Sequence, residues 1–289
     1  MVTRIAVAGD AGIAARVRAA LRVHPALCEV NELELVCMHG KADRCDCAGL
    51  VSGGPPPADT RPWQRLAIDI VLDCSGGDAR AHLAAGAQRV LRCTPDASRH
   101  DITVIYGVNH ARLCDSHRSV HGANSAAHCI APVARVLHYA IGISSGIVTV
   151  MHPPGIAGDG IPSSCTGVAQ HLESALPVLE HRFDETAQIA LPNGPASLVG
   201  LVFEAQRETS VEEVNALIQC ASFGAFGNLL LYSDVPFSMA PSERDTRSSV
   251  FEAGLTRVSG RMVKICAGYR SDWGFCNRLI DTVALMARL

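Results

Sequence analysis

The chain has 289 residues, more than a single hydrophobic core usually organises, so we expect two domains. Its 25 Lys and Arg residues nearly balance its 28 Asp and Glu residues, the formal net charge is −3, and no basic cluster is long enough to follow a phosphate backbone. This argues against nucleic acid as a partner. No run approaches about 18 consecutive apolar residues and the N-terminal residues lack signal-peptide features, so we expect a cytoplasmic protein with no membrane partner.

Strand and helix patterns alternate in the first half of the chain. An apolar run at residues 4–8 leads into Gly9 and Gly12, and residues 13–21 continue with helical spacing. A further helix is predicted at 79–87, and further strands are predicted at 68–74, 89–93 and 102–106. This alternation predicts a parallel, doubly wound α/β sheet of the Rossmann type.

Strands outnumber helices in the second half. The predicted strands occupy residues 146–151, 186–191, 197–204, 229–232 and 262–267. The predicted helices occupy residues 125–141 and 211–221. This grouping predicts an α+β domain on a mainly antiparallel sheet. We therefore divide the chain into a Rossmann-type domain at 1–123, completed by a C-terminal helix at 275–289, and an α+β domain at 124–274.

Twelve cysteines raise the question of disulfides or a metal site. Thiols of a cytoplasmic chain of this size stay reduced, so we predict no disulfide framework. The best candidate metal ligands are Cys45 and Cys47, with Cys37 and His39 nearby. Their C-x-C spacing does not match a zinc ribbon, and no second pair follows at a suitable distance. We favour a cysteine-rich surface loop and predict no metal.

The glycine turn after the first strand is compared with the dinucleotide-binding pattern G-x-G-x-x-G. Gly9, Ala11 and Ala14 stand at its three positions, and the Ala11 methyl crowds the approach of a phosphate. Glu32 stands about 20 positions on, where a carboxylate binds the ribose. The turn predicts either an NAD or NADP site or a domain that keeps its shape without the cofactor.

Five motifs further along carry a family resemblance. They are TVIYGVNH at 103–110, NSAAHCIAPVARVLH at 124–138, GISSGIVTVMH at 142–152, TRVSG at 256–260 and YRSDWGFCNRLIDTV at 269–283. In order and spacing they resemble the glyceraldehyde-3-phosphate dehydrogenase family, and two stretches, GISSGIVTVMH and SDVPFSMA, lean toward its erythrose-4-phosphate dehydrogenase branch. The resemblance implies a cofactor domain and a catalytic domain with the active site at their junction, NAD or NADP, a small-molecule substrate, and a homodimer or homotetramer.

The resemblance also implies individual site residues. Cofactor contacts fall at Gly9, Ala11, Gly12, Ile13, Asn31, Glu32, Ser75, Cys93 and Ser271. Thr166 lies in a loop similar to the family's P-S-T-G-A segment and matches a residue that binds substrate phosphate. Other phosphate-binding positions have changed: Ala190 replaces an arginine and Ala126 replaces a threonine. We therefore expect a small aldehyde other than the usual phosphorylated triose.

The family's nucleophilic cysteine falls at Ser125, and its general base falls at His152. A serine hydroxyl is rarely ionised at neutral pH and is a weak nucleophile toward an aldehyde. We favour Ser125 as the N-cap of its helix; a Ser–His pair in acyl transfer and a serine introduced to trap a complex are alternatives. Cys129 is expected to be a small buried residue, and Cys165 is an alternative nucleophile.

Three functions remain open from the sequence. The first is a divergent oxidoreductase that uses NAD or NADP on a small aldehyde. The second is a catalytically inactive relative that serves as a binding or assembly protein, which the accumulated replacements favour. The third is a hydrolase or acyl transferase that uses Ser125 and His152.

Overall fold

The computed structural model describes residues 2–9, 13–24, 33–39, 63–76, 78–93, 100–152, 167–186, 188–191, 197–235, 245–270 and 273–289. The chain divides into two compact units. The first unit comprises Met1–Ala123 with Cys276–Leu289, and the second comprises Asn124–Phe275. No helix in the described ranges is both long enough and apolar enough to cross a bilayer.

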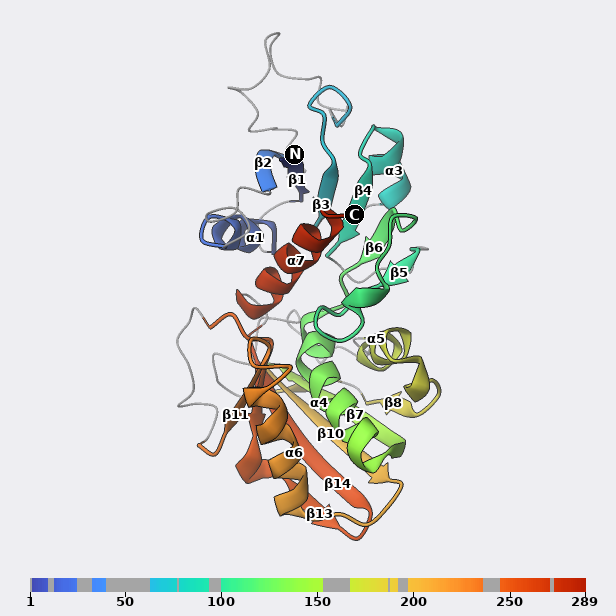
Figure 1. The fold of residues 1–289 in the computed structure, drawn as a ribbon, viewed down its shortest axis with the longest axis vertical. Helices are drawn as coiled ribbons and strands as arrows, with labels where there is room; N and C mark the ends of the chain where they lie inside the picture. Colours follow the sequence, from blue (N-terminus) through green and yellow to red (C-terminus); the bar gives the residue numbers. More distant parts are fainter. Residues whose placement is uncertain are drawn as a thin grey trace. The chain divides into compact units, whose positions relative to one another are not determined.

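The first unit is built on a parallel sheet in the order β2-β1-β3-β4-β6-β5 (Figure 1). Its strands are β1 (Thr3–Ala8), β2 (Leu33–His39), β3 (Ile70–Asp73), β4 (Arg89–Arg92), β5 (Ile102–Thr103) and β6 (Ser119–His121). Every pairing between them is parallel. The chain leaves β1 toward β2 on one side and returns to β3 on the other, which places a topological switch point between β1 and β3. The predicted doubly wound α/β sheet is confirmed.

Helices cover the first sheet because its strands are apolar on both faces. The helices of this unit are α1 (Ile13–Leu21), α3 (Ala79–Ala84), most of α7 (Trp273–Met286) and the 3₁₀ turn η1 (His110–Arg112). Trp63 is fully buried in an apolar cluster with Val71 of β3, Val90 of β4 and Ala79 of α3. Its indole Nε1 donates to Nδ1 of His82, 3.0 Å away, so the one polar atom of the tryptophan is satisfied.

The second unit is built on a mixed sheet in the order β11-β12-β14-β10-β7-β8, with β13 on β14 and β9 on β7. Its strands are β7 (Ile143–His152), β8 (Phe183–Glu185), β9 (Ile189–Ala190), β10 (Ser197–Ala205), β11 (Leu230–Ser233), β12 (Ser249–Glu252), β13 (Arg257–Ser259) and β14 (Met262–Tyr269). The long central strand β10 pairs antiparallel with both β7 and β14, and the parallel pairs lie at the edges. The predicted mainly antiparallel sheet is confirmed.

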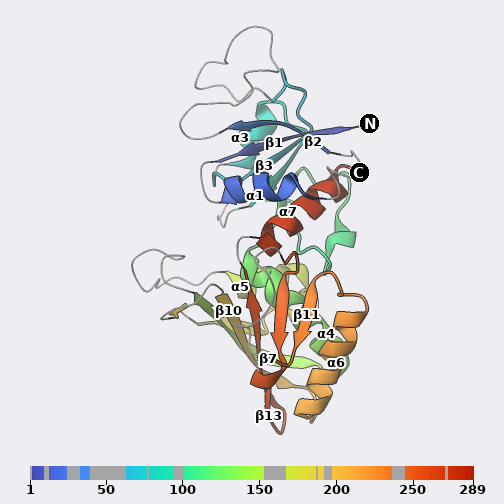
Figure 2. The same ribbon diagram turned by 90° about the vertical axis from the view of Figure 1, so that its left-hand side faces the viewer.

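Helices lie on one face of the second sheet. They are α4 (Ser125–Ile141), α5 (Val168–Ala175) and α6 (Val211–Phe223), with the short turns η2 (Pro177–Leu179) and η4 (Ala253–Leu255). Helix α4 is buried along most of its length against β10, β12 and β14, and α6 lies beside it (Figures 1 and 2). On β7 and β10, Ile147 and Val202 remain 48% and 37% exposed, so this part of the sheet keeps an apolar surface open to solvent.

Some predicted elements were wrong in extent. The strand expected at 102–106 ends after Thr103, because the Asn109 side chain accepts from the Ile105 N–H and donates to the Thr103 carbonyl, both at 2.8 Å, and folds the chain into a turn. The strand expected at 186–191 is reduced, within its described residues, to β9. Helix α5 and strands such as β6 and β12 were missed because segments of three to eight residues carry little periodicity.

The expected cysteine-rich surface loop was also partly wrong. Cys37 and His39 lie in strand β2, where they pair with Ala6 and Ala8 of β1. Cysteine and histidine interrupt the apolar pattern that would have predicted a strand here. Parallel pairing with the buried strand β1 nevertheless gives these residues an extended conformation. Cys45 and Cys47 lie outside the described residues.

Candidate active site

Helix α4 begins at the position where the resemblance places the nucleophile. Its N-cap is Asn124, whose side-chain oxygen accepts the Ala127 N–H at 2.8 Å. Ser125 is therefore the first residue inside the helix, and the prediction that Ser125 is the N-cap was wrong. An asparagine at the preceding position supplies the cap equally well and leaves the Ser125 hydroxyl available for other contacts. Ser125 is half-buried at the positive end of the helix dipole.

His152 stands at the end of β7, half-buried, and its Nδ1 lies 2.9 Å from Oγ of Ser197. Ser197 is the first residue of β10 and is buried. The antiparallel register places it opposite His152, because Leu198 pairs with Met151. Burial lowers the pKa of His152, so the imidazole is held neutral at neutral pH. The sequence analysis predicted His152 but missed Ser197, whose contact depends on strand register.

Tyr269 connects the two predicted catalytic positions. It ends β14, pairs with Ser197, and its ring meets the His152 ring edge to face with 6.3 Å between centroids. Its hydroxyl is buried beside the hydroxyls of Ser197 and Ser125, without a hydrogen bond of normal geometry. Burial and the nearby Cys129 thiol raise the pKa of Tyr269 far more than the two serine hydroxyls lower it. Tyr269 is therefore a neutral phenol, and it was missed although its motif had been recognised.

Cys129 lies one helical turn after Ser125 and is fully buried. Its Sγ is 3.6 Å from both the Ser249 hydroxyl and the Gly268 carbonyl. Burial raises the pKa of Cys129 to about 12, so its thiolate is essentially unpopulated at neutral pH. The prediction of a small buried residue is confirmed. Cys129 cannot take over the role of the missing nucleophile at position 125.

The carboxyl edge of the first sheet contains the described part of the glycine turn. Gly9 follows β1 with φ +134°, and a Cβ at this position would lie 2.8 Å from the carbonyl carbon of Cys74. Only glycine allows this close approach of the two strand ends. Next to it, both the Ser75 N–H and the Ser75 hydroxyl bond to the Asp73 carboxylate. Cys93 is buried at the end of β4, so its thiol is not exposed to a ligand.

The remaining predicted positions divide by what the structure describes. Ile13 is the first residue of α1, and Ala126 is buried in the first turn of α4. Ala190 lies on β9 and pairs with His152, so the position where the resemblance implies an arginine is next to this histidine. Seven further candidates lie outside the described residues: Ala11, Gly12, Asn31, Glu32, Cys165, Thr166 and Ser271.

Comparison with known proteins decides the family. Residues 155–271 match the family described as glyceraldehyde 3-phosphate dehydrogenase, C-terminal domain. The chain is 38% identical over 248 residues to a glyceraldehyde-3-phosphate dehydrogenase of Pseudomonas aeruginosa, which covers 78% of this chain and 73% of that protein. It belongs to the glyceraldehyde-3-phosphate dehydrogenase family.

Other family members give the same picture. Glyceraldehyde-3-phosphate dehydrogenases of Cereibacter sphaeroides and Xanthobacter flavus are 39% and 36% identical over 254 residues, covering 79% of this chain and 74% of each relative. The predicted family and its two-part fold class are thus confirmed. The leaning toward the erythrose-4-phosphate dehydrogenase branch stays a prediction.

Proposed function

We propose that this family member is an oxidoreductase that oxidises a small aldehyde with NAD or NADP, and that His152 is its general base. The observation that carries the proposal is the hydrogen bond between Nδ1 of His152 and Ser197, in a site that also gathers Tyr269 and Ser125. A base must be held in one orientation and must be neutral at the working pH. The Ser197 contact supplies the first property, and burial supplies the second.

The tautomer of His152 follows from the role we propose. For Nε2 to accept a proton, Nδ1 must carry the ring proton and donate it to the Ser197 oxygen. The Ser197 oxygen then accepts from the imidazole, and the buried Tyr269 hydroxyl lies beside Ser197 and Ser125. His152 would remove a proton from the Ser125 hydroxyl or from a water as that oxygen attacks the aldehyde carbonyl. The tetrahedral adduct formed in this way would be the hydride donor; with water as the nucleophile it would give the acid directly, and with Ser125 it would give an ester that a second water must hydrolyse.

The edge of the first sheet supports a dinucleotide as the cofactor. The switch point between β1 and β3 is the place where open parallel sheets bind nucleotides, and Gly9 keeps the two strand ends close together there. When bound, NAD or NADP supplies the hydride acceptor. The residues proposed to contact it in the described part are Gly9, Ile13, Ser75 and the backbone of Cys93.

The proposed substrate is an aldehyde without the family's usual phosphate groups. Ala190 offers no cation beside His152, with which it pairs, and Ala126 offers no hydroxyl after Ser125. A phosphate bound near His152 would leave its charge without the arginine that the resemblance implies. A neutral or singly charged small aldehyde fits this depleted site better.

A second candidate is an inactive relative that serves as a binding or assembly protein. The observation in its favour is that position 125 carries a serine while the nearest thiol, Cys129, is buried with its pKa raised to about 12. The hydrolase alternative is weaker, because Ser125 makes no direct hydrogen bond to His152 in the described structure and the described residues show no carboxylate on that imidazole.

One experiment separates these functions. Binding of NAD and NADP to the purified chain is measured by calorimetry, and formation of reduced nicotinamide is then followed by absorbance with a panel of small aldehydes. Binding with turnover supports the oxidoreductase. If the parent chain binds a dinucleotide without turnover, and turnover appears in Ser125→Cys, the chain is an inactive relative whose cofactor site and fold are intact. If the chain binds neither NAD nor NADP, the oxidoreductase proposal is overturned.

A further inference from the structure

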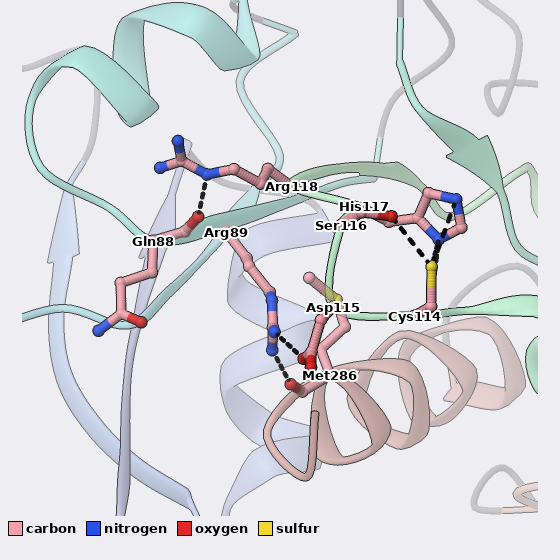
Figure 3. Close-up of polar contacts among 8 residues, drawn as sticks. All are labelled: Gln88, Arg89, Cys114, Asp115, Ser116, His117, Arg118 and Met286. Atoms are coloured by element: carbon pink, nitrogen blue, oxygen red, sulfur yellow. Dashed lines mark hydrogen bonds and ion pairs between the residues drawn. The ribbon is translucent and has the colours of Figure 1, made fainter.

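A loop of the first unit, residues 113–118 between η1 and β6, carries an exposed thiol beside a histidine (Figure 3). The Cys114 sulfur lies 3.4 Å from Nδ1 and 3.9 Å from Nε2 of His117, and 3.1 Å from the Ser116 hydroxyl. This loop contains none of the residues used in the proposed function. A thiol, a base and a hydroxyl donor are thus gathered on six consecutive residues.

The proton positions in this cluster can be assigned from the backbone. The Cys114 N–H, which can only donate, points at Nδ1 of His117 at 3.2 Å. Nδ1 is therefore the unprotonated nitrogen of the neutral imidazole, and it is also the ring nitrogen nearer to the sulfur. It accepts the thiol proton when the sulfur attacks an electrophile, and it gives up its contact with the Cys114 N–H as it does so, because this nitrogen has a single lone pair. The Ser116 hydroxyl can donate to the sulfur and stabilise the negative charge that develops on it.

Ion pairs and hydrogen bonds on both sides hold the loop in place. The Asp115 carboxylate is bonded to the Arg89 guanidinium at 2.8 Å, and Arg89 also donates to the Met286 carbonyl at the end of α7. On the other side Arg118 donates from Nε to the Gln88 carbonyl at 3.0 Å. Figure 3 shows these contacts around the cysteine. Contacts with β4 and the end of α7 therefore hold the thiol and the imidazole in place. Bringing the two groups together costs less entropy than it would in a loop without these contacts.

The other described cysteines lack this combination of exposure and base. Cys129 and Cys93 are buried. Burial raises the pKa of the Cys129 thiol, and a hydrogen bond with the Cys74 thiol, followed by burial, raises the pKa of the Cys93 thiol. Cys220, on α6, is exposed like Cys114, but no imidazole contacts its sulfur among the described residues. Cys220 is therefore a matched internal reference for what exposure alone does to reactivity.

We propose that Cys114 is a modification site that forms a mixed disulfide with low-molecular-weight disulfides, with His117 as its base. The thiol proton passes to Nδ1 of His117 while Sγ attacks one sulfur of the small disulfide. The old S–S bond breaks, a new one forms to Cys114, and the released thiolate takes the proton from the imidazolium. One protein thiol and one disulfide thus become one mixed disulfide and one small thiol. The exposed loop gives a bulky disulfide room to approach.

The test uses glutathione disulfide as the probe on the purified full-length chain. Mass spectrometry of tryptic peptides measures the rate of mixed-disulfide formation at each cysteine, and Cys114 is alone in the peptide LCDSHR, residues 113–118. We expect Cys114 to react on the order of a hundredfold faster than Cys220, the low end of what a positioned base contributes. In His117→Gln, which removes the base but keeps a polar side chain, the two rates should become similar.

Two controls make the outcome decisive. His181→Gln removes an exposed histidine that is not near a described cysteine and should leave the ratio of the two rates unchanged. Unfolding in guanidinium should bring the two rates together, because the geometry is lost. Equal rates of mixed-disulfide formation at Cys114 and Cys220 in the folded parent protein would overturn the proposal. So would a ratio of these two rates that stays unchanged in His117→Gln when circular dichroism shows that the variant is folded.

Discussion

The Ser197 hydroxyl lies 2.9 Å from Nδ1 of His152 although 45 residues separate them in the chain. The two residues end up together because β7 and β10 pair antiparallel and bring the end of one strand next to the start of the other. This contact orients the imidazole and, in the tautomer we propose, makes Nε2 the proton acceptor. It is the feature on which the proposed chemistry depends most.

Replacing Ser197 by alanine tests this dependence. We expect Ser197→Ala to lower kcat on the order of tenfold with little change in KM, because the base loses its orientation but the substrate pocket is kept. It should also lower the free energy of unfolding by ~1–3 kcal/mol, since Nδ1 of His152 loses its partner in a half-buried site. Ser197→Thr, which keeps the hydroxyl, should recover most of the rate. A rate for Ser197→Ala equal to that of the parent would contradict the positioning role.

Replacing Ser125 by cysteine tests the nucleophile position. The new thiol would stand in the first turn of α4, where the helix dipole favours a thiolate. We expect Ser125→Cys to react with iodoacetamide at this position at neutral pH, whereas Cys129 stays unmodified because it is buried with a pKa of about 12. If the cofactor site is intact, the same variant should oxidise aldehydes faster than the parent protein. Ser125→Ala is the control, and modification of Cys129 in the folded protein would contradict the prediction.

Replacing Gly9 by alanine tests the edge of the first sheet. The added methyl would meet the Cys74 backbone at 2.8 Å, and φ +134° is unfavourable for any L side chain. We expect Gly9→Ala to lower the free energy of unfolding by roughly 2 kcal/mol or more and to weaken dinucleotide binding. Gly254→Ala, where nothing lies within 4 Å of the added methyl, is the matched control and should change neither quantity. Urea denaturation and calorimetry measure the two effects.

The acid stability of the protein should depend on Asp73. Burial alone would raise its pKa, but the His82 imidazole, whose Nε2 lies 3.7 Å from Oδ1, and the hydrogen bonds from Ser75 more than offset burial, so the pKa lies below its ordinary value of 3.8. The folded chain therefore binds fewer protons than the unfolded chain between these two values. The contribution of Asp73 is complete above the unfolded pKa and is lost as the pH falls through the folded pKa.

Urea denaturation at several pH values measures this contribution. We expect Asp73→Asn to lower the free energy of unfolding at pH 7 by ~1–3 kcal/mol, and to flatten its decline as the pH falls from the unfolded-state value of 3.8 toward the lower folded pKa. Asp184→Asn, at an exposed position of β8, should leave the pH profile unchanged. A profile for Asp73→Asn that runs parallel to the parent's across this range would show that Asp73 does not couple protons to folding.

The open face of the second sheet should support self-association. Ile147 and Val202 pair across β7 and β10 and are 48% and 37% exposed, and Met262 on β14 is 49% exposed. These residues border a groove of about 600 Å³ that also contains Arg182 and Glu204. The homodimer or homotetramer that the resemblance implies needs a contact surface, and we expect a second copy of the chain to cover this one.

Light scattering after size exclusion tests this association. Val202→Asp places a charge in the apolar surface and should yield the monomer mass, while Phe223→Asp, at an 84% exposed position of α6, should not change the mass. A dimer or tetramer that persists in Val202→Asp would show that the contact lies elsewhere.

The sequence by itself determined the longer regular elements and the family. Helix α4 was predicted with its correct bounds, because 17 residues of helical periodicity describe a local property that the tertiary structure did not need to alter. The alternation of apolar runs and helices likewise predicted the parallel sheet of the first unit. The motif around His152 marked the residue that we propose as the base, since spacing along the chain carries that information directly.

Only the tertiary structure decided which side chains surround that base. Ser197 and Tyr269 reach His152 through the register of three paired strands, and register is set by burying faces of the whole sheet rather than by any local pattern. The same holds for the cap of α4, where Asn124 and not Ser125 takes the backbone N–H. The Cys114 and His117 pair is close in sequence, yet its geometry depends on Arg89 and the end of α7. Local periodicity is written in consecutive residues, whereas contacts between distant residues are fixed only when the chain packs.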